Sequence, residues 1–541
     1  MSAGPNDARL NDARLNDAVD DSSGGCPMNR RRFLQTLGFG AAASAATLAP
    51  GNVGAALGAT ATTAQRLPTG FGRMFPKLRP FAPASPALTA ALLDMGKKGG
   101  IMDAKDDLSA GPKALIIDPA LNLNNPNNPT QTAGTTFVGQ FLAHDLTFDI
   151  GSVLDTPSDP GLATNGRTPQ VDLESLYGTG PMLSAHLYDA TDRAKFRVES
   201  GGVFEDLPRG ADLGAIIADP RNDENVVLSG MQAAFLKFHN NIVDYLRRKK
   251  GPRPEDFEAA RRLATRHYQW MLVHEYLPQI VGQALVDDIL VNGRRFYRPK
   301  GGAVIPVEFQ GAAFRFGHSQ VRPSYRANMA GNADGTAVFG FIFDPDNNQG
   351  LDDPDDFVGG FRGARRFIGW QTFFDFGDGE VKPNKLIDTK ISTPLFNLPL
   401  STIATRDVPV VLPQRSLLRH VTWSIPSGQD IAFAMHEPLL GAADFPELAG
   451  YGLGLEARTP LLYYVLKEAE VMQDGLRLGP VGGRIVAEVL LGLMKMDDSS
   501  YLNARPRWRP SLPTRTGAVT GDFNMADILT FAGVDPTSRG Q

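Results

Sequence analysis

The chain has 541 residues, of which 42% are hydrophobic and 21% are charged, so it can bury a large core and is not a disordered protein. Its 54 Lys and Arg against 59 Asp and Glu give a net charge of −5, which argues against a nucleic-acid partner. The single cysteine, Cys26, excludes a disulfide framework, a cysteine zinc site and an iron–sulfur cluster. Any metal chemistry must therefore rest on the eight histidines and on oxygen ligands.

The first 59 residues have the composition of a leader. The pentapeptide Asn6-Asp7-Ala8-Arg9-Leu10 is repeated at 11–15, and this polar repeat predicts disorder. Arg30-Arg31-Arg32-Phe33-Leu34 then precedes a weakly apolar Gly/Ala run, which resembles a twin-arginine export signal. No later segment holds the roughly 18 consecutive apolar residues of a membrane span. We therefore expect a bacterial protein exported to the periplasm or the cell exterior, with a leader at 1–59 and a mature domain at 60–541.

The mature region is predicted to be mostly helical. Apolar residues recur at helical spacing after Thr130 and predict a helix of about four turns; they are Phe137, Phe141, Leu142 and Leu146. Further helical patterns cover 224–250, 254–283 and 485–493, whereas alternating strand patterns are few and short. No linker separates two cores, so we expect a mainly α fold, in which a single large helical domain has long loops and few short strands.

Several common catalytic motifs are missing from the sequence. It has no G-x-S-x-G elbow, no P-loop and no G-x-G-x-x-G fingerprint, so hydrolase and nucleotide chemistry lack support.

A polar pair on the helix predicted after Thr130 is a candidate functional site. Gln140 and His144 are four residues apart and share one helix face, whereas Asp145 is rotated by about 100°. A glutamine and a histidine aimed into one cavity, with a carboxylate behind them, form a polar site beside a candidate cation ligand.

Four segments, in this order, point to one family. They are Gly139-Gln140-Phe141-Leu142-Ala143-His144-Asp145-Leu146-Thr147, Val171-Asp172-Leu173-Glu174-Ser175-Leu176-Tyr177-Gly178, Asp219-Pro220-Arg221-Asn222-Asp223-Glu224-Asn225 and Ala313-Phe314-Arg315-Phe316-Gly317-His318-Ser319. Together they resemble motifs of the animal-type haem peroxidases, the peroxidase–cyclooxygenase superfamily. The resemblance covers residue 60 to the C-terminus and implies one helical domain built around haem b.

The resemblance implies a catalytic role for four polar residues. His318 would bind the haem iron as a neutral imidazole. On the other side His144 would be the general acid–base that moves a proton between the two oxygens of hydrogen peroxide. Arg221 would stabilise the negative charge that builds on the leaving oxygen. Gln140 would orient water, peroxide or a small anion.

The resemblance also concerns how the haem is held. Arg315 and Arg419 are the implied cofactor contacts, with Arg419 at a propionate. Ala143 and Asn225 stand where mammalian members have an ester-forming Asp and a sulfonium-forming Met, so these two covalent links cannot form and oxidation of chloride is not expected. Glu224 occupies the second ester position, so one ester link to the haem remains open.

A calcium site is implied next to the distal helix. The residues that match the family's calcium loop are Asp145, Thr168, Gln170 through its carbonyl, Asp172 and Glu174. All offer the hard oxygen atoms that Ca²⁺ prefers. Such a site would tie Asp145 to the 168–174 loop and so fix the neighbouring His144.

The implied function is oxidation of small aromatic donors, or of iodide, bromide or thiocyanate, by hydrogen peroxide through an oxyferryl intermediate. A fatty-acid dioxygenase of the same superfamily is the first alternative, but the position of its radical tyrosine is Arg315 here. A catalytically silent, calcium-bound extracellular interaction protein is the second alternative. Neither a nucleic-acid partner nor a membrane span in the mature form is expected.

Overall fold

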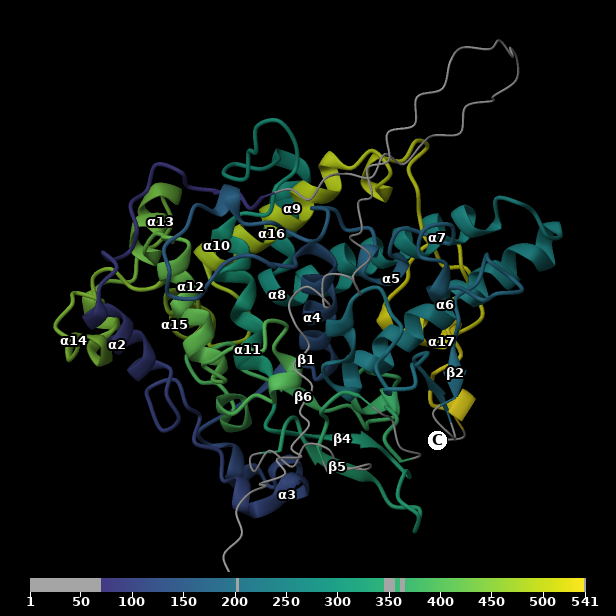
Figure 1. Ribbon diagram of the computed structural model, residues 1–541, viewed down its shortest axis with the longest axis horizontal. Helices are drawn as coiled ribbons and strands as arrows, with labels where there is room; N and C mark the ends of the chain where they lie inside the picture. The colour runs from purple at the N-terminus through teal and green to yellow at the C-terminus, as the bar shows by residue number, and fades with distance from the viewer. Residues whose placement is uncertain (1–69, 201–203, 345–355, 361–364, 540–541) are drawn as a thin grey trace, which may run out of the picture. The chain divides into compact units, whose positions relative to one another are not determined.

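Helix α4 (Gly134–Leu146), the helix predicted after Thr130, lies in the middle of the folded unit in the computed structural model (Figure 1). The structure describes residues 70–200, 204–344, 356–360 and 365–539. Residues 65–541 form one compact unit, and the leader predicted at 1–59 lies outside the described residues. No helix in the described part of the chain is long and apolar enough to cross a membrane.

The described elements are mostly helices, as the sequence predicts. The helices are α2 (Pro86–Met95), α3 (Gly111–Ile117), α4, α5 (Glu174–Tyr177), α6 (Val226–Lys250), α7 (Asp256–Met271), α8 (Leu277–Val281), α9 (Gln283–Asn292), α10 (Val307–Gln310), α11 (Gly317–Gln320), α12 (Leu412–Thr422), α13 (Gly428–Met435), α14 (Pro446–Ala449), α15 (Leu461–Gln473), α16 (Pro480–Met496) and α17 (Met525–Phe531). The strands are β1 (Asn127–Thr132), β2 (Glu199–Ser200), β3 (Glu205–Asp206), β4 (Ser324–Asn328), β5 (Val338–Phe341) and β6 (Pro383–Lys385).

The strands described form three small antiparallel pairs, β1 with β6, β2 with β3 and β4 with β5. Figure 1 shows α6 and α7 on one side of α4 and α12, α13 and α15 on the other, with β4 and β5 at the lower edge. The fold is therefore a mainly α domain with few short strands, as the sequence predicts.

Aromatic packing holds α4 against α6 and α7. The ring of Phe141 stacks on Phe235 of α6 at 4.9 Å and meets Tyr268 of α7 edge-on at 6.3 Å. All three side chains are buried. Burying one such side chain contributes about 1.5–3 kcal/mol, so these contacts fix the rotation of α4 about its own axis. Gln140 and His144 lie on that helix.

The ends of α6 follow from local sequence. Asn225 caps the first turn, because its side-chain oxygen accepts a hydrogen bond from the backbone N–H of Leu228 at 2.9 Å. The helix ends at Gly251, whose φ of 72° is a left-handed conformation that glycine adopts without strain. The cap sets where the chain enters α6, and the residues just before it, 220–224, lie beside α4.

A π-helical turn interrupts the helical region predicted at 254–283. The residues of this turn, Leu272–Tyr276, connect α7 to α8. A single turn of π-helix inserts one extra residue into an α-helix and is frequent at functional sites. The spacing of apolar residues does not reveal such a turn, because the helical pattern continues on both sides of it.

Candidate functional site

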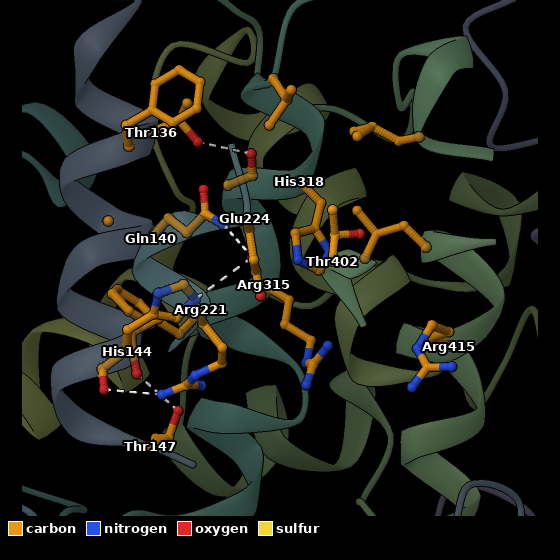
Figure 2. Close-up of a pocket in the computed structure, with 18 of the residues that line it drawn as sticks. Thr136, Gln140, His144, Thr147, Arg221, Glu224, Arg315, His318, Thr402 and Arg415 are labelled. Carbon is orange, nitrogen blue, oxygen red and sulfur yellow. Dashed lines mark hydrogen bonds and ion pairs between the residues drawn. The ribbon is translucent and has the colours of Figure 1, made fainter. Parts of the chain in front are cut away.

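A cavity of 340 Å³ lies between α4, the start of α6, α11 and α12. It brings together most of the site residues predicted from the sequence: Gln140, His144, Arg221, Glu224, Arg315, His318 and Arg419. Figure 2 shows Gln140 and His144 projecting from one helix towards Glu224, with His318 and Arg315 across from them. Residues from segments more than 100 positions apart in the chain therefore share one polar cavity.

The imidazole of His144 is held in one tautomer. Its Nδ1 lies 2.8 Å from Oδ1 of Asn222, and Nδ2 of Asn222 donates to Oε1 of Gln232 at 2.9 Å. Because the bond to Gln232 fixes the orientation of the Asn222 amide, Oδ1 must accept from His144, so Nδ1 carries the hydrogen. The other nitrogen, Nε2, is left with a lone pair and lies 4.0 Å from Oε2 of Glu224.

Burial keeps this imidazole neutral. Removal from water, and then the positive charge of Arg221, lower the pKa of His144 to about 3. At neutral pH the Nε2 atom is thus an unprotonated base inside the cavity. A general base needs this combination of a fixed geometry and an available lone pair.

Glu224 and Gln140 form a second polar pair in the cavity. Nε2 of Gln140 donates to Oε2 of Glu224 at 3.0 Å. Burial raises the pKa of Glu224 to about 8, against the lowering effect of Arg221. Glu224 is therefore a neutral carboxylic acid at neutral pH, and the distance of 4.0 Å to His144 is not a contact between charged groups.

Arg221 is anchored by a buried acid. Its Nε and Nη2 donate to the two carboxylate oxygens of Asp219 at 3.0 and 2.6 Å, and Nη2 also donates to the carbonyl of His144 at 3.1 Å. Arg167 donates to the same carboxylate. The pKa of Asp219 is lowered, since Arg221 and Arg167 outweigh the cost of its complete burial. Arg167 also pairs with Glu174 at 3.6 Å, and of these two arginines it is Arg221 that lines the cavity.

His318 mirrors His144 across the cavity. Its Nδ1 lies 3.3 Å from Oγ of Ser416, whose hydroxyl donates to the carbonyl of Leu412 at 3.0 Å. The serine hydroxyl has one hydrogen, which it donates to the carbonyl of Leu412. Oγ of Ser416 therefore accepts a hydrogen bond from Nδ1–H of His318. Burial, followed by the charge of Arg315, lowers the pKa of His318 to about 3. Its Nε2 therefore also holds a lone pair.

Three arginines lie next to His318. Arg315 is half-buried and donates from Nε to the carbonyl of Gln310 at 2.9 Å. Burial and the nearby Arg419 and Arg415 lower its pKa to about 9. Arg419 is paired with Asp149 at 2.5 Å, so its charge is already balanced within the protein. A half-buried, uncompensated guanidinium such as that of Arg315 calls for an anion in the cavity.

The predicted calcium ligands gather behind α4, outside this cavity. The carboxylate of Asp145 accepts the backbone N–H groups of Leu173 and Ser175 at 2.9 and 3.1 Å. Burial, aided by the negative charge of Glu174, raises the pKa of Asp145 to about 7. Burial together with Asp145 and Glu174 raises the pKa of Asp172.

The predicted calcium ligands around Glu174 do not have the arrangement of a metal centre in this structure. Glu174 accepts both the backbone N–H and the hydroxyl of Thr168, at 2.9 and 2.6 Å, and Gln170 lies in the same turn. No group of three or more His, Cys, Asp or Glu within the described ranges has the arrangement to hold a metal ion. The acidic side chains fit a cation by charge, and they are occupied by hydrogen bonds from the backbone.

Sequence reasoning missed two residues of this site. Asn222, which sets the tautomer of His144, lies next to the predicted Arg221, but the contact joins residues 78 positions apart. Tyr276 lines the cavity from the π-helical turn. Its hydroxyl packs so closely on α4 that a Cβ at Gly139 would lie 2.5 Å from it. The glycine in the Gly139-Gln140 segment was the available signal that another side chain approaches there.

Comparisons with known proteins point to one family over part of the chain. The family model for the animal haem peroxidase matches residues 152–358. Mouse thyroid peroxidase is 23% identical over 241 residues, which is 39% of this chain and 26% of that protein. The first matched relatives are likewise covered over only 7 to 19% of their length.

Two solved structures share the fold. Peroxidase A from Dictyostelium discoideum has a TM-score of 0.54 at 16% identity, covering 86% of this chain and 93% of its own. A fatty acid α-dioxygenase from Arabidopsis thaliana has a TM-score of 0.51 at 14% identity, covering 81% and 74%. At these identities the likeness concerns the fold, which both kinds of enzyme have in common.

Proposed function

We propose that this chain, which matches the animal haem peroxidase family over residues 152–358, is a haem peroxidase that uses hydrogen peroxide to oxidise small aromatic donors or iodide, bromide or thiocyanate. The observation that carries the proposal is the pair of neutral imidazoles that line the cavity, His144 and His318. Each has Nδ1–H bonded to a fixed acceptor and Nε2 free. One is suited to binding a metal and the other to moving a proton.

The residues of the cavity fit haem b. His318 offers a neutral Nε2 to iron, and the half-buried guanidinium of Arg315 offers an uncompensated charge to a propionate. Arg419 is a further propionate contact in the proposal, although Asp149 already balances its charge. Bound there, the haem would supply the iron that takes oxygen from peroxide and stores its oxidising equivalents.

The chain's own residues handle the proton. Nε2 of His144 would accept a proton from one oxygen of hydrogen peroxide and return it to the oxygen that leaves as water. The Asn222 contact keeps Nδ1–H in place throughout this exchange. The guanidinium of Arg221, which lines the cavity beside His144, would lower the cost of the negative charge that develops on the leaving oxygen, and Arg167 helps to hold Asp219, the anchor of Arg221. Nε2 of Gln140 donates to Glu224, and the Gln140 carbonyl, which accepts a long bond of 3.5 Å from Nδ2 of Asn225, would also accept from water or peroxide and orient it.

We include one covalent haem link in the proposal. Glu224 lines the cavity and would supply the carboxyl oxygen of an ester to a haem methyl group, with hydrogen peroxide as the two-electron oxidant that removes the methyl hydrogen. Ala143 and Asn225, the neighbouring positions that line the same cavity, have no acidic or thioether group. Glu224 is thus the proposed ester position.

We further propose that Ca²⁺ binds at the acidic side chains behind α4, through Asp145, Thr168, the carbonyl of Gln170, Asp172 and Glu174. Mutual repulsion among the carboxylates of Asp145, Asp172 and Glu174 supports the proposal, since a cation between them would relieve that repulsion.

We also propose export. The composition of the leader supports export to the periplasm or cell exterior by the twin-arginine route.

The test is turnover by haem-loaded protein with hydrogen peroxide and a small phenol, or iodide, as donor. We expect oxidation that requires peroxide and that falls by about 10²–10⁴-fold in His144→Gln, since the general base is gone. His186→Gln, at an exposed histidine, is the matched control and should be unchanged. Oxygen uptake with a fatty acid in place of peroxide would instead favour a dioxygenase, and no turnover with either would favour the silent interaction protein.

A further inference from the structure

A cluster of aromatic side chains lies outside the cavity, where α7 and the π-helical turn meet the chain after α16. Trp270 stacks on the ring of His274 at 3.8 Å and approaches Tyr501 at 5.4 Å and Trp508 at 6.2 Å. The cluster therefore holds two of the four tryptophans of the chain. None of its residues takes part in the peroxide site described above.

We propose that Trp270, His274 and Tyr501 form a surface oxidation site, at which oxidising equivalents produced in the cavity are passed to phenolic groups of donors too large to enter it. The inference rests on the proposed peroxidase function. It adds a second place of substrate oxidation and a second class of substrate, phenols attached to polymers or proteins.

The first observation is a phenol bonded to an imidazole. The hydroxyl of Tyr501 and Nε2 of His274 lie 3.2 Å apart, and Tyr501 is only 6% exposed. Burial raises the pKa of this phenol, so it cannot lose its proton to water before it is oxidised. Partial burial lowers the pKa of His274, so the imidazole is neutral and has a lone pair for the phenol proton. A phenol with a fixed proton acceptor is easier to oxidise than one without.

The second observation is a tryptophan bonded to a carboxylate. Nε1 of Trp270 donates to Oδ1 of Asp522 at 2.8 Å, and Trp270 is 5% exposed. Asp522 places a negative charge beside an indole that stacks directly on His274. Positive charge on an oxidised indole is stabilised by such a partner. Trp270 can therefore relay an electron between Tyr501 and the interior.

The third observation is the connection to the cavity. His274 and Tyr276 both belong to the π-helical turn Leu272–Tyr276. Tyr276 lines the cavity, whereas His274 is exposed at the surface cluster. This single turn therefore carries one aromatic ring at the cavity, Tyr276, and one at the surface cluster, His274. The partly buried Trp508 gives the cluster a rim that a donor can contact.

The electron and proton balance of the step is simple. Tyr501 loses its O–H hydrogen: the proton moves to Nε2 of His274, and the electron reduces by one equivalent the cofactor that peroxide has oxidised. A phenol outside then gives one electron back to Tyr501, His274 returns the proton, and the donor releases its own proton to solvent. Two phenols are oxidised to phenoxyl radicals for each hydrogen peroxide that is reduced to two waters.

The test compares free tyramine with tyramine coupled to polyethylene glycol, because the polymer cannot enter the cavity. In haem-loaded Tyr501→Phe we expect oxidation of the polymer-bound phenol to be lost and oxidation of free tyramine to be unchanged. Freeze-quench electron paramagnetic resonance after peroxide should show a tyrosyl radical in the wild type that is absent from Tyr501→Phe. Tyr245→Phe, at a tyrosine outside the cluster, is the matched control and should keep both signals.

A second variant separates proton transfer from packing. His274→Phe keeps an aromatic ring against Trp270 but removes the proton acceptor, so the radical signal should fall while the melting temperature stays close to that of the wild type. The inference would be overturned if Tyr501→Phe kept both the radical signal and the oxidation of the polymer-bound phenol. It would also be overturned if wild-type protein oxidised free tyramine but showed no radical. Failure of the wild type to oxidise free tyramine would instead contradict the proposed peroxidase function.

Discussion

Asn222 accepts a hydrogen bond from Nδ1 of His144 over 2.8 Å, and this contact leaves Nε2 of His144 as the nitrogen that faces the cavity. Replacing Asn222 by Leu keeps a similar volume but removes the acceptor. We expect the reaction of the haem-loaded protein with peroxide to slow by about 10–100-fold, as for other residues that orient an active imidazole.

Asn222→Asp provides the control for this prediction. A carboxylate oxygen at the same position can still accept from Nδ1–H, so Asp should recover most of the rate that Leu loses. The measurement is the stopped-flow rate of the absorbance change after mixing with hydrogen peroxide, at equal haem content. Equal rates in wild type and Asn222→Leu would show that the tautomer of His144 does not limit the reaction.

Glu224→Gln tests the covalent link. A glutamine retains the hydrogen-bonding geometry towards Gln140 but cannot form an ester, so all of the haem should become extractable by acidified organic solvent. The wild type, after turnover with peroxide, should retain haem on the protein under the same extraction. Complete extraction of haem from the wild type would contradict the ester proposed at Glu224.

Removal of Ca²⁺ should destabilise the protein. An ion that binds only the folded state adds to the free energy of unfolding, so a chelator should lower the melting temperature and excess Ca²⁺ should restore it. Asp172→Asn, which removes one proposed ligand charge, should reduce the response to Ca²⁺. Asp189→Asn, at an acid that bonds Thr191 in a surface turn, should leave it unchanged. A wild-type melting temperature that does not respond to Ca²⁺ would rule the site out.

Glu468 gives the stability of the fold a pH dependence. Its carboxylate is fully buried and accepts the backbone N–H groups of Val481 and Gly482 at the start of α16, and burial raises its pKa to about 7. An unfolded glutamate ionises near pH 4.3. The stabilising contribution of Glu468 is therefore complete below about pH 4 and is lost as the pH rises through 7.

The measurement for Glu468 is the free energy of unfolding of wild type and Glu468→Gln between about pH 4.5 and 8. The wild type should lose stability relative to the variant as the pH rises, because the variant cannot ionise there. Other titrating groups are common to both proteins and cancel in the difference. A difference that is constant with pH would mean that Glu468 is not protonated in the folded protein.

The parts of the site that sequence predicts best are those that lie within one helix. The apolar spacing of Phe137, Phe141 and Leu142 predicts α4, and the four-residue interval places Gln140 and His144 on one face of it. The resemblance to a family adds His318 and Arg221, which the structure brings to the same cavity. These features depend on local periodicity or on matched motifs.

The partners of those residues depend on distant packing and were not predictable from local patterns. The contact of Asn222 with His144, the pairing of Arg419 with Asp149 and the approach of Tyr276 to α4 all require the folded chain. The π-helical turn is also hidden, since one extra residue in a helical ladder hardly alters an apolar pattern. These partners set the tautomer of His144, the charge balance of Arg419 and the position of the Tyr276 ring in the cavity.

The central claim is that His318 binds a haem that reacts with peroxide, and an absorption spectrum of purified, haem-loaded protein tests it most directly. The account predicts an intense Soret band that changes on addition of hydrogen peroxide and returns when a small phenol is added, and a loss of that band in His318→Gly. Protein that shows no Soret band after loading with haem would contradict the claim, and so would a Soret band that hydrogen peroxide and His318→Gly both leave unchanged.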